Sequence, residues 1–237
     1  MQRRVAPRPE LINPMDMRCA LALVLALTVT VRLEADTPAL FQGGDVPTLS
    51  VMSTDVGGGE VLLEVTVDRM GTVRLIKPLR QTATFSERMI QAVMTWRFKP
   101  AEVDVPAAQR KPGGSAIERV DTKVLVAGVF RRPSVIGPTL GEPIRDVATA
   151  SADIPFPTSI ATLIYPPAAI SPGVVLVEVR VDTRGGVSDA RVRVSSPGFD
   201  SVALGAAQQW QFRPAKTRGV NAPAVAYIVF GFPVPKN

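Results

Sequence analysis

The sequence contains two near copies of one aromatic motif. Segment 96–101 (WRFKPA) recurs as segment 210–215 (WQFRPA), an offset of 114 residues from Trp96 to Trp210. Alternation along an extended segment places the Trp and Phe rings of each copy on one face, and the proline then ends regular structure. We therefore expect each motif to anchor the end of a helix onto a sheet. The expected structural anchors are Trp96, Phe98, Pro100, Trp210, Phe212 and Pro214.

The same offset relates further positions without a gap. The matched pairs are Glu64 and Glu178, Val65 and Val179, Val67 and Val181, Asp68 and Asp182, Gly71 and Gly185, Val73 and Val187, and Phe85 and Phe199. Agreement over this length indicates a tandem duplication of one small domain. The two predicted units are residues 60–130 and residues 165–237, and the first is the more diverged copy.

Each predicted unit has the order strand, turn, strand, helix, strand. Residues 60–68 and 174–182 alternate between apolar and other side chains, as in a strand with one buried face. The helices are expected from Ser86 to about Trp96 and from Asp200 to about Trp210, each with a polar N-cap. The expected fold class is α+β: two tandem two-layer units, each with a three-stranded antiparallel sheet and one packed helix.

Residues 1–35 have the features of a targeting segment. The apolar run 19–31 is 13 residues long and lies between Arg18 and Arg32. A membrane-spanning helix needs roughly 17–25 residues, whereas the apolar core of a secretory signal needs roughly 7–15. We therefore predict a signal peptide or, as the alternative, an uncleaved N-terminal anchor. Residues 36–59 are predicted to be a linker or a degenerate first element, and residues 131–164 a Pro-rich linker.

The composition excludes several kinds of chemistry. The chain has no His, so it lacks the commonest general base and the commonest metal ligand. Its one Cys, Cys19, lies in the apolar run. A net charge of +6 without clustered basic and aromatic residues is typical of a soluble protein and does not indicate nucleic-acid binding. We predict no catalytic residues, no cofactor and no metal, and therefore no enzyme.

Four acidic residues recur at equivalent positions of the two units and are candidate sites. Asp68 and Asp182 precede turn glycines, where an Asp carboxylate commonly accepts hydrogen bonds from the turn backbone. Glu64 and Glu178 are predicted by alternation to lie on the solvent side of their strands. A catalytic or metal-binding role for these carboxylates is the less favoured alternative.

The second unit resembles the C-terminal domain of the TonB energy transducers. The resemblance covers about residues 165–234: Tyr165-Pro166, the strand ending in Val181-Asp182, the motif at 210–215, and a last strand that ends in FGF at 230–232. It implies a periplasmic protein whose last strand offers a free edge to the TonB box of an outer-membrane receptor, by strand addition. The peptide-binding edge would be Val225, Ala226, Tyr227, Ile228 and Val229, with Tyr165 nearby. Tyr227→Pro would then abolish binding.

The chain also departs from the energising members of that family. They keep a transmembrane helix with a functional His, which contacts a proton-driven motor in the inner membrane, and this chain has no His. Motor proteins are thus expected partners only if the chain is anchored. The alternative is a non-energising scaffold of the cell envelope, in which the two repeats pack as a pseudo-dimer and hide the edge. Self-association through that edge is a further possibility.

Overall fold

The computed structural model describes residues 37–49, 59–130, 142–143, 150–161, 163, 166 and 171–233. The predicted signal peptide or anchor, residues 1–35, lies outside the described residues. Within the described part, no helix is long and apolar enough to cross a membrane.

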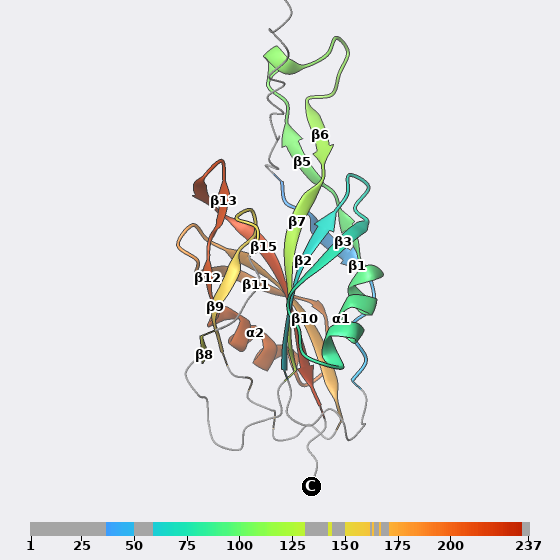
Figure 1. Ribbon diagram of the computed structural model, residues 1–237, viewed down its shortest axis with the longest axis vertical. Coiled ribbons are helices and arrows are strands. Elements are labelled where there is room, and N and C mark those ends of the chain that lie inside the picture. Colours follow the sequence, from blue (N-terminus) through green and yellow to red (C-terminus); the bar gives the residue numbers. More distant parts are fainter. Residues whose placement is uncertain are drawn as a thin grey trace, which may run out of the picture. The chain divides into compact units, whose positions relative to one another are not determined.

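The core of the fold is one six-stranded sheet (Figure 1). Its strands are β2 (Gly59–Val67), β3 (Val73–Arg80), β7 (Thr122–Phe130), β10 (Gly173–Val181), β11 (Val187–Val194) and β15 (Ala224–Phe232). The spatial order is β11-β10-β15-β7-β2-β3. Neighbouring strands are antiparallel except at the centre, where β15 and β7 run parallel.

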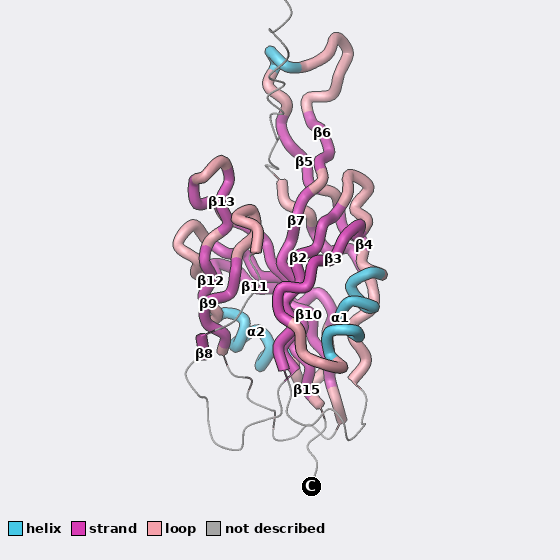
Figure 2. Tube along the Cα trace, in the orientation of Figure 1, coloured by secondary structure: helices cyan, strands magenta, loops and turns pink. Residues whose placement is uncertain are grey.

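The two helices cover opposite faces of this sheet. The buried side chains of α1 (Phe85–Met94) share a core with Val61, Leu63 and Val65 of β2. Those of α2 (Asp200–Gln208) share a second core with the alternate residues of β10. Figure 2 shows the two helices with the strands between them. Central strands are consequently covered on both faces, which requires apolar side chains on both.

Short strands flank the sheet. β1 (Leu40–Gly43) pairs with β4 (Arg97–Lys99), and β12 (Gln211–Arg213) pairs with β9 (Phe156–Ile160), which also pairs with β8 (Glu142–Pro143). The hairpin of β5 (Ala101–Asp104) and β6 (Ile117–Val120) includes the one-turn 3₁₀ helix η1 (Ala107–Gln109), and β13 (Ala215–Thr217) pairs with β14 (Val220–Ala222). Residues 36–59, predicted to be a linker or a degenerate first element, hold β1, whereas residues 131–164, predicted to be a Pro-rich linker, hold β8 and β9.

The two halves repeat the same order of elements, and β2, β3 and β4 correspond to β10, β11 and β12 at the predicted offset of 114. The prediction of two separate three-stranded sheets is nevertheless wrong, because the last strands of the two halves join them into one sheet. The reason lies in these strands: residues 124–130 and 225–232 are buried throughout. A strand that is apolar on both faces is stable only when both faces are covered.

Candidate functional site

The predicted peptide-binding edge lies at the centre of the sheet. Residues Val225 to Val229 of β15 pair with β10 on one side. On the other side, Ala226–Gly231 pair with Leu125–Phe130 of β7. The expectation of a free edge is therefore wrong, because the last strand of the first half already uses it. Tyr165, the other residue predicted to lie at this edge, is outside the described residues.

The register of this junction follows from the opposite orientation of the two halves. Phe130 pairs with Gly59 in the first half, and Phe232 pairs with Gly173 at the equivalent position of the second half. The side chains of these equivalent residues of β7 and β15 nevertheless point to opposite faces of the sheet. Paired residues in a parallel ladder point to the same face. The strands are accordingly offset by one residue, so that Phe130 pairs with Gly231 instead of Phe232.

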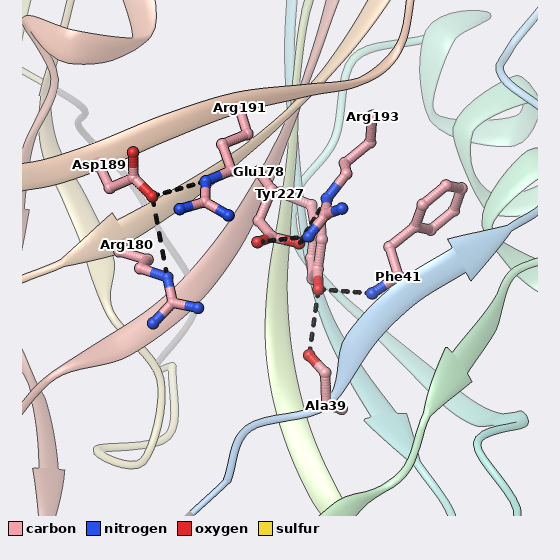
Figure 3. Close-up of polar contacts among 8 residues, drawn as sticks. All are labelled: Ala39, Phe41, Glu178, Arg180, Asp189, Arg191, Arg193 and Tyr227. Carbon is pink, nitrogen blue, oxygen red and sulfur yellow. Dashed lines mark hydrogen bonds and ion pairs between the residues drawn. The ribbon is translucent and has the colours of Figure 1, made fainter.

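Tyr227 links this junction to the N-terminal strand β1. Its side chain is fully buried on the α1 side of the sheet, in contact with the rings of Phe41, Trp96 and Phe98. The Phe41 N–H donates to Tyr227 Oη at 2.9 Å, and Tyr227 Oη donates to the Ala39 carbonyl at 3.1 Å (Figure 3). Burial raises the pKa of Tyr227 well above its ordinary value. A Pro at position 227 would disrupt the middle of the sheet, so it is not a clean test of peptide binding.

Glu178 is buried, contrary to the prediction of a solvent-side position. It is 2% exposed and lies opposite Tyr227 in the β10–β15 ladder. Arg193 of β11 binds it in a bidentate ion pair, with Nε and Nη2 donating at 2.9 Å each (Figure 3). Alternation alone placed this face toward solvent, but Leu176 on the same face of β10 belongs to the core that contains the first half's residues. Arg193 was not singled out in the sequence, although its charge makes it a suitable partner for a buried carboxylate.

Glu64, the counterpart of Glu178, is also buried, at 5% exposure. It accepts hydrogen bonds from the Ser151 N–H at 2.9 Å and the Ser151 Oγ at 2.7 Å, and Lys123 Nζ lies 3.2 Å away. Burial alone would raise the pKa of Glu64, but the hydrogen bonds from Ser151 and Lys123, with the Lys123 charge, outweigh it and lower this pKa. Ser151 belongs to the predicted linker, so periodicity gave no signal for this contact.

The two turn aspartates bind backbone. Asp68 Oδ1 accepts from the N–H groups of Met70 and Thr72, both at 2.9 Å. Asp182 Oδ1 accepts from those of Arg184 at 2.8 Å and Gly186 at 3.0 Å. These backbone hydrogen bonds lower the pKa of Asp182. Their geometry is that of Asx turns, as expected.

The aromatic motifs lie in the two cores. Trp96 and Trp210 are fully buried, and Phe98 and Phe212 are nearly so. The indole N–H of Trp96 donates to the Asp45 carbonyl at 2.7 Å. The indole N–H of Trp210 has no acceptor among the residues that the structure describes. Pro100 and Pro214 follow β4 and β12 and are half-buried.

The outer edges of the sheet, β3 and β11, are irregular and charged. Each pairs with its neighbour through two register shifts, and β3 also contains Pro78. On β11, Asp189 accepts from Arg191 at 2.9 Å, and Arg180 Nε of β10 lies 4.0 Å from the same carboxylate (Figure 3). Bulges, prolines and charges are the features by which edge strands avoid pairing with other chains.

Residues 162–232 match the family model described as Gram-negative bacterial TonB protein C-terminal. The chain thus contains one TonB C-terminal domain, and the match does not extend to residues 60–130. No curated protein and no solved structure matches the chain. The domain implies a role in TonB-dependent energy transduction with outer-membrane receptors, and domains of this family are periplasmic and non-enzymatic. Within the described residues, no group of three or more acidic, His or Cys side chains could hold a metal ion.

Proposed function

We propose that the protein is a non-energising interaction protein of the periplasm that serves TonB-dependent transport. In this proposal, residues 60–130 are a diverged second copy of the TonB C-terminal domain, packed on the first as an intramolecular pseudo-dimer. The single observation that carries it is the parallel pairing of β15 with β7. By resemblance, β7 takes the position on the last strand that a receptor segment would otherwise occupy.

The packing around the junction supports a permanent closure. Separating β7 from β15 would expose Tyr227 and Val229 on one face, and Leu125, Ala127 and Val129 on the other. Burial of a large apolar side chain contributes roughly 1.5–3 kcal/mol. Opening the junction would therefore cost on the order of 10 kcal/mol. A short receptor segment that pairs with β15 along its whole length would have to offset this cost.

A second candidate function is the binding of a receptor's TonB box by strand addition to the part of β15 that β7 leaves open. The parallel ladder begins at the Ala226–Leu125 pair, so Ala224 and Val225 lie before it. In this function the chain holds a receptor segment at the start of β15 and does not pull on it. Export of the chain by residues 1–35 belongs to both candidates, and motor proteins are partners only if this segment stays as an anchor.

The test is chemical cross-linking of the envelope of the source bacterium, followed by purification of the full chain and mass spectrometry. We expect cross-links between the described strands and a TonB-dependent outer-membrane receptor. The control is a Tyr227→Asp variant, whose buried charge should open the junction and change the cross-linked positions. Recovery of the chain without any such receptor, under conditions in which a TonB protein of the same cell is cross-linked to its receptors, would contradict the proposal.

A further inference from the structure

A groove on the first half lies between helix α1 and the segment that follows β1. Its volume is about 580 Å³, which is within the range of small-molecule sites. Residues 45–48 form one wall. The other wall is a single face of α1 and its C-cap, with the spacing i, i+3, i+4 and i+7: Arg88, Gln91, Ala92 and Thr95. No residue that lines the groove belongs to β7 or β15, so the groove is separate from the junction of the two halves.

Hydrogen bonds hold the segment 45–48 against the end of α1. The Asp45 N–H donates to Thr95 Oγ1 at 2.8 Å, and the Trp96 indole N–H donates to the Asp45 carbonyl at 2.7 Å. Thr95 Oγ1 in turn donates to the Ala92 carbonyl at 2.8 Å. The main chain of Asp45 is thus fixed, while the exposed residue lines the groove. A wall that is already fixed reduces the ordering cost of binding.

The groove has one acidic and one basic residue, and they belong to its opposite ends. Asp45 is bound at Thr95, whereas Arg88 precedes Thr95 by seven residues along the helix. At about 1.5 Å per residue, seven helical residues span about 10 Å. The floor between these ends is apolar, with buried or half-buried side chains: Val46, Pro47 and Ala92. The groove therefore suits a ligand with a cationic end, an anionic end and a small apolar middle.

The fold does not require the polar wall of α1. At the offset of 114, Arg88 corresponds to Val202 of α2, and Gln91 corresponds to Gly205. The second half, which contains the family match, thus forms the same helix without a charge or an amide at these positions. The charged lining is accordingly a feature of the first half and not of the matched domain.

We propose that this groove binds a short zwitterionic peptide of about three residues, with its ammonium group at Asp45 and its carboxylate at Arg88. An extended peptide spans about 3.3 Å per residue, so three residues match a separation of about 10 Å. Recognition is by the two ends of the peptide, so the ligand adds no strand to a sheet. The inference does not rest on the proposed function, because the groove lies outside the junction.

The chemistry of each end fits this ligand. A guanidinium binds a carboxylate through two parallel hydrogen bonds, and the five N–H donors of Arg88 allow it to keep a contact within the protein as well. At the other end, the Asp45 carboxylate accepts hydrogen bonds from an ammonium group. Between them, Thr48 and Gln91 offer a hydroxyl and an amide to the peptide main chain. The narrow apolar floor favours small side chains such as that of Ala.

The probe is trialanine with free termini, titrated into the full chain labelled with ¹³C at its Ala, Val and Thr methyl groups. We expect saturable NMR shifts at Val46, Thr48 and Ala92. Acetylation of the ammonium group and amidation of the carboxylate, made separately, should each weaken binding at least about fivefold. Alanine, which is too short to reach both ends, should be weakened by a similar factor. No saturable shift at these methyl groups, or equal affinity for trialanine and its two capped forms, would overturn the proposal.

Two variants assign the ends of the peptide. Asp45→Asn should weaken trialanine at least about fivefold but should change the affinity for the acetylated peptide less than about twofold, since that peptide has no ammonium group to lose a partner. Arg88→Gln should behave in the same way toward the amidated peptide. The charge-matched controls are Glu87→Gln and Arg74→Gln, at exposed positions outside the groove walls, with wild-type affinity for trialanine. If each variant weakens its capped peptide as much as trialanine, the site is refuted. If Arg88→Gln does not fold, the amidated peptide tests the same contact on the wild type.

Discussion

Removal of one hydroxyl group tests whether strand β1 is clamped onto the junction. Tyr227→Phe keeps the buried ring but removes the oxygen that accepts from the Phe41 N–H at 2.9 Å and donates to the Ala39 carbonyl at 3.1 Å. Both backbone groups would then lie in the core without this partner, since Tyr227 is fully buried and Phe41 is 8% exposed.

The magnitude follows from these two hydrogen bonds. Each contributes about 0.5–1.5 kcal/mol net, and an unsatisfied buried group costs about 1–3 kcal/mol. Partial relaxation of β1 lowers the total cost of the two lost hydrogen bonds and the two unsatisfied backbone groups. We therefore expect Tyr227→Phe to reduce the free energy of unfolding by about 3 kcal/mol. For a domain of this size, that corresponds to a decrease in Tm of roughly 6–12 °C.

The assay combines thermal unfolding with amide hydrogen exchange. Exchange at the Phe41 amide of Tyr227→Phe is expected to increase more than exchange at the amides of β10, because the loss is local to β1. The control Val220→Ala, at an exposed hairpin position, should change stability by less than about 0.5 kcal/mol. A Tyr227→Phe protein with wild-type Tm and wild-type exchange at Phe41 would refute the clamp.

Three further predictions concern buried polar groups. Arg193→Met leaves Glu178 buried without its ion-pair partner and should lower the free energy of unfolding, measured with denaturant, by about 3–5 kcal/mol. The double variant Glu178→Met/Arg193→Met should recover most of that loss, and equal stability of the single and double variants would contradict the pairing. Because the pKa of Glu64 is lowered below the ordinary 4.5, its contribution is present above the unfolded-state pKa and is lost as pH falls through the folded-state pKa. Wild-type stability should therefore fall more steeply than that of Glu64→Gln below about pH 4.5, and parallel curves would argue against it. Trp96→Phe should cost about 1–2 kcal/mol more than Trp210→Phe, because only the Trp96 indole donates a hydrogen bond to a described residue; equal losses on urea unfolding would count against this difference.

Local pattern was sufficient to predict the three long strands and the helix of each half, but not the short hairpins β5–β6 and β13–β14. The offset of 114 placed equivalent strands at β2 and β10, and the Asp68 and Asp182 turns have the predicted backbone hydrogen bonds. These features depend on side-chain periodicity and turn chemistry, which act over a few residues. The aromatic motif likewise follows a helix in both halves, and its Trp residues lie in the cores.

The arrangement of the halves could not be predicted in the same way. Alternation assigned Glu64 and Glu178 to solvent, but each lies on the face that the other half covers. One signal was present: residues 225–232 contain no charged side chain, which is typical of a strand buried on both faces. No local pattern specifies that β7 is its parallel neighbour, and the short strands β1 and β9 depend on long-range pairing with β4 and β12.

Amide hydrogen exchange of the full chain, measured residue by residue along β15, tests the central claim most directly. In a strand paired on both sides, successive N–H groups donate alternately to the two neighbours. The account predicts slow exchange at every amide from Ala226 to Gly231, because β10 and β7 both accept from this strand. Fast exchange at every second amide of this stretch, as in an edge strand, would contradict the closed junction and restore the free peptide-binding edge.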